Sequence, residues 1–173
     1  MSSLSQKICL IGNFNVGKTS LIRRFVENKF SDSYLTTIGV KISRKLVTVP
    51  KFDRQVNFLI WDIEGKTKEK EISTNYFRGA AGAIIVGDLT RVNTLEDVSE
   101  HIQSFLAMNP QSFIVVALNK SDLVKQAKLT KLAELFGSYD HKQVLANYLT
   151  SAKTGEFVDE MFHQLATTLV ENI

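Results

Sequence analysis

Apolar and polar positions alternate along the chain in a repeating order that predicts short strands followed by amphipathic helices. Apolar runs predict six strands, at 7–11, 41–49, 56–61, 83–88, 113–118 and 144–149. Apolar residues that recur every three or four positions predict about five helices, at 18–28, 69–77, 95–108, 129–136 and 157–172. The turn at 49–54 joins the second and third strands as a hairpin. We therefore expect an α/β fold, with a mostly parallel six-stranded sheet, helices on both faces and one antiparallel edge strand.

The composition is that of one ordinary domain. With 173 residues, 44% of them hydrophobic, the chain can bury a full core, and we expect a single domain over 1–173. The net charge of +3 is mild, and no basic stripe is interleaved with aromatic residues, so nucleic-acid binding is not expected. Cys9 is the one cysteine, so no disulfide framework can form, and no apolar stretch reaches the roughly 20 residues of a membrane span. These features predict a cytoplasmic protein.

Residues 12–19 carry the first candidate chemistry. They read GNFNVGKT, which matches G-x-x-x-x-G-K-[ST] and lies between a predicted strand and a predicted helix. In such a loop the backbone N–H groups and the helix N-terminus bind phosphate oxygens. We expect Lys18 to reach the β- and γ-phosphates and the Thr19 hydroxyl to bind Mg²⁺. The alternative, for this motif alone, is a glycine-rich turn that caps an ordinary helix.

Residues 119–122, with the sequence NKSD, indicate which base the site would take. They follow the predicted strand at 113–118. The carboxylate of Asp122 can accept two donors at once, and guanine offers its N1–H and its N2 amino group along one edge, whereas adenine does not. Asp122 therefore favours guanine; the alternative is a polar turn that caps the next helix.

Three further residues complete a candidate metal and γ-phosphate site. Asp62 stands at the carboxyl end of a predicted strand, where ligands bind in open parallel sheets, and could hold Mg²⁺ directly or through water. Gly65 could bring its N–H close to the γ-phosphate because it has no Cβ. Thr37 could close over the metal from a loop. Taken singly, a strand-end turn and a solvated loop threonine are the simpler interpretations.

These motifs, in this order, resemble the Ras superfamily of small GTPases, and most closely its Rab branch. The Rab-like features are TIGV at 37–40, Trp61-Asp62 and YFRGA at 76–80, and the resemblance covers essentially the whole chain. It implies a three-layer P-loop NTPase G domain that binds GTP or GDP with Mg²⁺ and hydrolyses GTP to GDP and phosphate. Such a protein acts as a molecular switch, and its switch regions bind effector and regulator proteins.

The resemblance also assigns roles to individual residues. The nucleotide-binding residues would be Asn15, Val16, Gly17, Lys18, Thr19, Ser20, Phe30, Tyr34, Asn119, Lys120, Asp122, Ser151, Ala152 and Lys153. The magnesium ligands would be Thr19, Thr37 and Asp62, and the catalytic positions Thr37, Gly65 and Lys66. Within the first set, Ser151 to Lys153 would contact the base, Lys120 and Phe30 would pack on its two sides, and Tyr34 would lie over the phosphates.

Lys66 and Phe14 depart from the family pattern at positions that matter for hydrolysis. Lys66 replaces the usual Gln in a degenerate switch II, and an ammonium cannot accept a hydrogen bond from the attacking water, so we predict slow intrinsic hydrolysis. Alternatively, Lys66 stabilises γ-phosphate charge in cis. Phe14 stands where a small residue is common and would obstruct an arginine finger, unless it folds outward onto the switch loops.

The switch surface is altered as well. Glu64 replaces the usual Ala, and its carboxylate would either disturb the phosphate and metal or pair with a lysine. Residues 66–71 are densely charged and Lys41-Ile42 replaces an acidic residue and Phe, so ordinary Rab effectors should fit poorly. The alternative is a solvated helix face of mixed charge.

Two function classes remain from the sequence. One is a switching GTPase; the other is an interaction module that holds GTP persistently. An ATP-using P-loop kinase is disfavoured by residues 119–122. The chain ends at Ile173 without the prenylated cysteines that are usual in Rab proteins, so either a tail has been removed or the protein has no lipid anchor. Membrane association is not expected for the chain as given.

Overall fold

A six-stranded sheet forms the centre of the computed structural model, which describes residues 3–33 and 36–173. The strands are β1 (Ser3–Gly12), β2 (Val40–Val49), β3 (Arg54–Ile63), β4 (Gly82–Asp88), β5 (Phe113–Asn119) and β6 (Val144–Leu149). They lie in the order β2-β3-β1-β4-β5-β6, and only the β2–β3 pair is antiparallel among the pairings of these strands. The predicted sheet, with its antiparallel edge strand and its hairpin turn at Pro50–Phe52, is confirmed.

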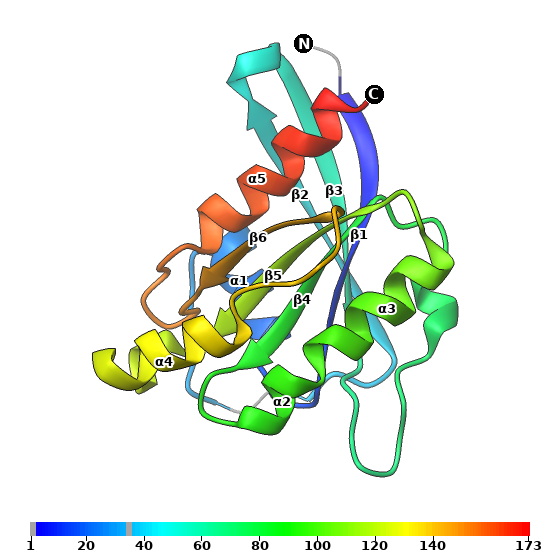
Figure 1. Cartoon of the computed structure of the whole chain (residues 1–173). Coiled ribbons are helices and arrows are strands. Elements are labelled where there is room, and N and C mark those ends of the chain that lie inside the picture. The colour runs from blue at the N-terminus through cyan, green and yellow to red at the C-terminus, as the bar shows by residue number, and fades with distance from the viewer. Residues whose placement is uncertain (1–2, 34–35) are drawn as a thin grey trace.

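Helices cover both faces of this sheet (Figure 1). They are α1 (Lys18–Glu27), α2 (Val92–Glu96), α3 (Val98–Met108), α4 (Gln126–Phe136) and α5 (Val158–Glu171). Side chains of α1 and α5 pack into one core cluster with β1, β3 and β5, whereas α3 and Leu132 of α4 pack into a second cluster on the opposite face. In the first cluster the rings of Phe25 and Phe162 stack with centroids 4.0 Å apart. The result is the predicted three-layer α/β fold.

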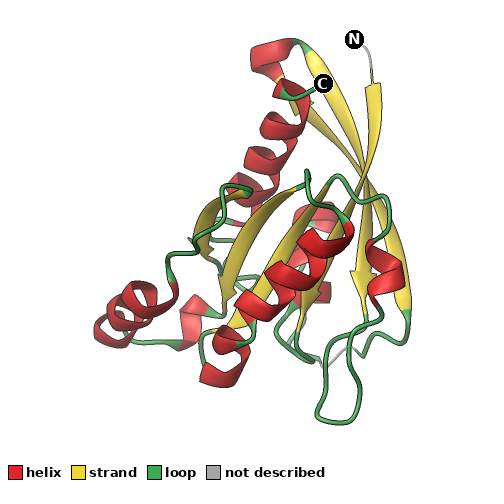
Figure 2. Cartoon of the chain, turned by 45° about the vertical axis from the view of Figure 1, so that its right-hand side comes forward, coloured by secondary structure: helices red, strands yellow, loops and turns green. Residues whose placement is uncertain are grey.

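The carboxyl ends of the parallel strands meet at one edge of the sheet (Figure 2). Helix α1 begins at this edge, directly after the loop that follows β1. The loops that follow β1, β3, β4 and β5 therefore lie close together, although they are far apart in the sequence. Strands β4 and β5 are buried on both faces along nearly their whole length, which makes this edge a rigid support.

The predicted helix at 69–77 is wrong. Residues 64–73 form a long loop that extends from the sheet (Figure 1), and only Thr74–Phe77 makes a short 3₁₀ turn, labelled η2. The segment 72–75 reads ISTN, and β-branched, Ser and Asn residues favour other backbone conformations over a helix. The loop also has local partners of its own, because the Thr67 hydroxyl accepts the Lys70 N–H at 3.0 Å. The predicted helix at 95–108 is divided into α2 and α3.

Among the described residues, none of the helices has the length and apolar character needed to cross a membrane.

Two leucine-to-alanine variants compare the core with the surface. Leu165 on α5 is fully buried, and a Cβ added to Gly82 would lie 2.9 Å from its Cδ1 atom. Leu135 on α4, by contrast, is 74% exposed. We expect Leu165→Ala to lower the free energy of unfolding by about 2–5 kcal/mol and Leu135→Ala to change it by less than about 0.5 kcal/mol. Urea denaturation at fixed nucleotide and magnesium concentrations measures both, and equal effects would contradict this packing.

Candidate functional site

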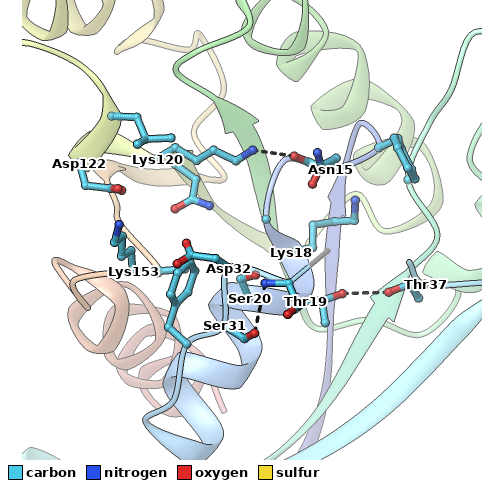
Figure 3. Close-up of a pocket in the computed structure, with 18 of the residues that line it drawn as sticks. Asn15, Lys18, Thr19, Ser20, Ser31, Asp32, Thr37, Lys120, Asp122 and Lys153 are labelled. Atoms are coloured by element: carbon cyan, nitrogen blue, oxygen red, sulfur yellow. Dashed lines mark hydrogen bonds between the residues drawn. The ribbon is translucent and has the colours of Figure 1, made fainter. Parts of the chain in front are cut away.

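A cavity of about 310 Å³ opens at the carboxyl edge of the sheet. It is lined by Phe14, Asn15, Gly17, Lys18, Thr19, Ser20, Phe30, Ser31, Asp32, Ser33, Thr37, Ile63, Gly65, Asn119, Lys120, Asp122, Leu123, Ala152 and Lys153. In Figure 3, Asp122, Lys120 and Lys153 lie at one end of this cavity, Thr37 lies at the other, and Lys18 lies between them. The sequence motifs at 12–19, 62–65, 119–122 and 150–153 are thus brought together around one space.

The loop between β1 and α1 is fixed from behind by Asn119. The Asn119 amide donates to the Val16 carbonyl at 3.0 Å and accepts from the Thr150 hydroxyl at 3.1 Å. Gly17 has φ +105°, and a Cβ at this position would collide with the same amide. Only glycine fits here, because both the backbone conformation and the space exclude a side chain. Protein groups therefore restrain the shape of this loop.

Lys18 is a buried cation inside this loop. Its ammonium donates to the carbonyls of Gly12 and Asn13 at 3.3 and 3.0 Å. Burial lowers the pKa of Lys18 to about 8; the Asp62 carboxylate opposes this shift and Arg91 adds to it. Two neutral carbonyls compensate a buried charge only in part, so a phosphate anion beside Lys18 would be strongly favourable.

The opposite end of the cavity carries the groups predicted to recognise a base. Asp122 is exposed, and one of its oxygens accepts the Ser151 hydroxyl at 2.7 Å, which fixes the carboxylate's orientation. Lys120 donates to the Asn15 carbonyl at 3.0 Å (Figure 3), and this bond ties the base end to the loop at 13–17. Arg24 of α1 donates to the carbonyls of Ala152 and Lys153 at 2.9 and 2.6 Å, which holds the last motif in place.

Thr19, Thr37 and Asp62 converge at the other end of the cavity. The Thr19 hydroxyl donates to Asp62 Oδ2 at 2.5 Å, Thr37 donates to the same oxygen at 3.3 Å, and the two hydroxyls are 2.8 Å apart. The second carboxylate oxygen, Asp62 Oδ1, is buried and has no hydrogen-bond partner among the described residues. Burial raises the pKa of Asp62, against the hydrogen bond from Thr19 and the charge of Lys18.

These three residues fit Mg²⁺. Hydroxyl and carboxylate oxygens are its preferred protein ligands, and an unpartnered buried carboxylate oxygen is the group that a cation or its water would satisfy. The described residues hold no cluster of three or more His, Cys, Asp or Glu that could bind a metal alone. A magnesium ion here would therefore have to share its ligands with phosphates, as in nucleotide sites.

Gly65 and Lys66 lie against the loop at 12–17. Lys66 N–H donates to the Gly12 carbonyl at 3.2 Å and its own carbonyl accepts Phe14 N–H at 2.8 Å. A Cβ on Gly65 would lie 2.7 Å from the Phe14 backbone, so only glycine permits this approach. Gly65 lines the cavity, whereas Lys66 does not.

The Lys66 side chain is directed to α3. Its ammonium lies 3.3 Å from Glu100, 3.5 Å from Asp97 and 3.9 Å from Glu71. Partial burial lowers the pKa of Lys66, but the hydrogen bond to Glu100 and the three carboxylates outweigh it and raise the pKa overall, so the side chain is a cation. The predicted catalytic position is thus occupied by a charge that is already paired within the protein.

The sequence left two alternatives for the side chains of Phe14 and Glu64, and the structure shows the contacts of each. Phe14 is 39% exposed and lines the cavity, and its carbonyl accepts a hydrogen bond from Arg91 at 2.7 Å. Glu64 does not line the main cavity; its carboxylate pairs with Lys70 at 2.8 Å and accepts Gly39 N–H at 3.3 Å. Of the two expectations for Glu64, pairing with a lysine is the one that the structure contains.

Some residues predicted for this site lie beside the cavity rather than in its lining. Val16, Ser151 and Asp62 are buried behind it and reach it through the hydrogen bonds described above. Tyr34 lies outside the described residues. The remaining predicted nucleotide-binding residues all line the cavity.

Asp88, at the end of β4, is a site residue that the sequence reasoning missed. Its side chain is only 1% exposed and forms ion pairs with Lys120 at 2.9 Å and Arg91 at 3.0 Å. Lys120 and Arg91 donate to the carbonyls of Asn15 and Phe14. Asp88 therefore fixes the loop at residues 12–17, which we call the phosphate loop, from the side on which Lys120 lies. Its position at a strand's carboxyl end was the signal that could have found it, since the same signal identified Asp62.

A second missed group joins the phosphate loop to α3. The Asn13 amide donates to Asp97 at 2.8 Å, and its oxygen lies 2.7 Å from Nε2 of the buried His101. Because the Asn13 oxygen can only accept, a neutral His101 must carry its proton on Nε2. Nothing in the local sequence pattern marks His101, whose spacing on α3 is that of a core residue.

Comparison with known proteins agrees with this geometry. Residues 7–171 match the Ras family. The chain is 34% identical over 171 residues to the GTP-binding protein ypt4 of Schizosaccharomyces pombe, covering 96% of this chain and 72% of that protein. It is 36% identical over 168 residues to Ras-related protein RABF2b of Arabidopsis thaliana, with 96% and 82% covered. Ras-related protein Rab-4A of Homo sapiens is 33% identical over 169 residues, with 96% and 75% covered.

Replacing Asp122 tests the base end of the cavity. Asp122→Asn would exchange an acceptor of two donors for an amide that can accept only one of them, and hydrogen bonds to charged groups contribute about 1.5–3 kcal/mol each. We expect GTP and GDP affinity to fall by roughly 10–150-fold, the factor that corresponds to the loss of one such bond. Titration with a fluorescent guanine nucleotide measures this, with exposed Asp140→Asn as the matched control. Unchanged affinity in Asp122→Asn would contradict the assignment.

His101 predicts a pH dependence of stability. Burial lowers the pKa of His101 from 6.5 to about 4, although Asp97 opposes the shift. The unfolded chain therefore binds this proton first, and the free energy of unfolding should fall as the pH falls from 6.5 to 4. His101→Gln keeps an N–H donor for Asn13 but cannot titrate, so its stability should fall less steeply over that interval. Urea denaturation across this pH range measures the free energy of unfolding of both proteins. If this free energy fell equally steeply with pH in the wild type and in His101→Gln, the prediction would be contradicted.

Proposed function

This chain belongs to the Ras family and is a Rab-like small GTPase; from that premise we propose that it binds GTP and GDP with Mg²⁺ as a molecular switch whose intrinsic hydrolysis of GTP is slow. The observation that carries the proposal is the order of groups along one cavity. A base-reading carboxylate, Asp122, lies at one end, the buried cation Lys18 in the middle, and the oxygens of Thr19, Thr37 and Asp62 at the other. A guanine nucleotide has its base, phosphates and metal in the same order. We also propose that 1–173 is a single G domain.

Nucleotide binding would use groups that are already fixed. Asp122 would accept the N1–H and the amino group of guanine, held in orientation by Ser151. Lys120, anchored by Asp88, and Phe30 would pack on the faces of the base. Lys18 would exchange its two carbonyl partners in part for phosphate oxygens, which relieves the cost of its burial.

The metal-binding residues would be Thr19, Thr37 and Asp62. Magnesium, when bound, would neutralise charge on the β- and γ-phosphates. Thr37 belongs to a loop, so its bond to the metal would depend on whether the γ-phosphate is present. Loss of that phosphate would release the loop at residues 36–38, which is how a nucleotide site becomes a switch. Effectors and regulators would recognise this change.

The positions of Lys66 and Phe14 support the proposal of slow hydrolysis. The Lys66 ammonium is paired with Glu100 and Asp97, outside the cavity lining, and has no acceptor with which to orient an attacking water. The same geometry opposes the alternative that Lys66 stabilises γ-phosphate charge in cis. Phe14 lines the cavity beside Gly65, in the region that an incoming arginine would need.

A second function class has specific support. If Lys66 and Phe14 abolish hydrolysis rather than slow it, the protein would hold GTP persistently and serve as an interaction module. The ion pairs of Lys66 with Asp97 and Glu100 favour this alternative over a fast switch. The convergence of Thr19, Thr37 and Asp62, the proposed magnesium ligands, favours a working GTPase instead.

Single-turnover hydrolysis separates the two classes. We expect phosphate release from GTP-loaded protein with Mg²⁺ to be slower than the order of 10⁻⁴ s⁻¹ seen for intrinsic hydrolysis in small GTPases that carry Gln. Lys66→Gln should raise the rate at least about tenfold, because an amide can orient the water. Lys68→Gln, the same change two residues on at an exposed position, should leave it unchanged.

Two outcomes would count against this account. A wild-type rate at or above that of Gln-containing relatives would remove the claim of slow hydrolysis. No gain in Lys66→Gln would show that Lys66 is not the limiting defect, and complete retention of GTP by both proteins would favour the interaction module.

A further inference from the structure

Two residues that replace the family's usual Ala and Gln, Glu64 and Lys66, both form ion pairs across the segment that follows β3. We call residues 36–38 the first switch segment and residues 64–77 the second. In the nucleotide site proposed above, the second segment would be held mainly through the N–H of Gly65 and the γ-phosphate. Here it has two additional attachments, each made by protein groups alone.

The first attachment joins the second switch segment to α3 and to the phosphate loop. The ammonium of Lys66, with its side chain only 18% exposed, lies 3.3 Å from Glu100 and 3.5 Å from Asp97. Asp97 also accepts the Asn13 amide at 2.8 Å, so the cation is part of a network that reaches the phosphate loop. The backbone of Lys66 exchanges two hydrogen bonds with Gly12 and Phe14. Side chain and backbone thus fix the same residue in two directions.

The second attachment joins the second switch segment to the start of β2. The Glu64 carboxylate lies 2.8 Å from the Lys70 ammonium and accepts Gly39 N–H at 3.3 Å. Glu64 N–H in turn donates to the Gly39 carbonyl at 2.8 Å. The side chains of Glu64 and Lys70 are 27% and 64% exposed, so solvent screens this ion pair and the bond to Gly39 N–H supplements it. Lys70 follows a turn in which Thr67 N–H donates to the Lys70 carbonyl. Its ion pair with Glu64 therefore joins the end of this turn to the residue that directly follows β3.

We propose that these two attachments, Lys66 to Asp97 and Glu100 and Glu64 to Lys70 and Gly39, hold the second switch segment in one arrangement whatever the bound nucleotide. Only the first switch segment then reports the γ-phosphate. The inference rests on the proposed function, because it concerns how that nucleotide site is read by partners. None of the attaching groups lines the nucleotide cavity, so none needs a phosphate as its partner.

The consequence is an unequal division of recognition between the two segments. Tyr76, which lies 6.5 Å from Trp61 between ring centroids, would be presented alike in the GDP and GTP forms. A partner that binds this part would not distinguish the two states. A partner that does distinguish them would have to contact the first switch segment, where Ile38 is 83% exposed.

Hydrogen–deuterium exchange of the full chain, loaded with GDP or with a non-hydrolysable GTP analogue and Mg²⁺, tests the proposal. We expect peptides that report on residues 36–38 to exchange more slowly with the GTP analogue, and peptides over 64–76 to exchange alike in both forms. In Lys66→Gln and in Glu64→Ala, exchange over 64–76 should rise about two- to fivefold in the GDP form and become dependent on the nucleotide. Raising the salt concentration should move the wild type towards the variants, because salt screens partly exposed ion pairs.

Lys68→Gln and Glu69→Ala are the matched controls. They make similar changes of charge in the same loop, at exposed residues for which the described structure contains no ion pair. Both should exchange like the wild type. The emission of Trp61, the single tryptophan, gives a second readout and should differ little between the two nucleotide forms of the wild type.

The outcomes separate this inference from the proposed function. A large nucleotide-dependent change over 64–76 in the wild type, or variants that match the wild type, would overturn the inference. Failure of the protein to retain guanine nucleotide would overturn the proposed function instead. Even then, faster exchange over 64–76 in Lys66→Gln than in Lys68→Gln, measured on the protein as purified, would support the attachments, and equal exchange would refute them.

Discussion

Burial of the Lys18 ammonium is the constraint on which the rest of the site depends. A cation in the protein interior is costly unless it has charged or well-placed polar partners, and here the structure supplies two backbone carbonyls and a nearby carboxylate. The loop that provides those carbonyls must keep its shape, which requires glycine at position 17 and the Asn119 amide behind it. The protein therefore keeps a buried cation at the centre of a cavity that a polyphosphate would complete.

The same requirement explains why side chains join the loops that follow β1, β4 and β5 to one another and to α3. Asp88, at the end of β4, holds Lys120 and Arg91 against the carbonyls of Asn15 and Phe14. From the other face of the loop, Asn13 is bonded to Asp97 and His101 of α3. A loop restrained from both sides can bring its N–H groups close to phosphate without losing conformational entropy at the moment of binding. The charged residues of the second switch segment extend this network rather than the nucleotide cavity.

Much of the fold could be predicted from the sequence, because long apolar runs bounded by turns specify strands that are buried on both faces. Each of the six expected strands was found, and β1 and β3 are longer than expected at both ends. The helix expected at 69–77 was wrong: Lys70 and Glu71 pair with Glu64 and Lys66, and the second half of the segment is rich in residues that disfavour a helix. Most expected nucleotide-binding residues line one cavity because their motifs follow strand ends. By contrast, Asp97 and Glu100 are separated from Lys66 in the sequence by η2, β4 and α2, and only the packing of α3 against the sheet makes them its partners.

The most direct measurement is to identify the nucleotide that the purified protein carries. Denaturing the protein after purification in Mg²⁺ and separating the released compounds by chromatography would show it. Our account predicts about one guanine nucleotide per chain, released faster when EDTA removes the metal, since Thr19, Thr37 and Asp62 would hold nucleotide and magnesium together. Bound adenine nucleotide, or an empty protein that GTP and GDP fail to bind at millimolar concentration, would contradict it.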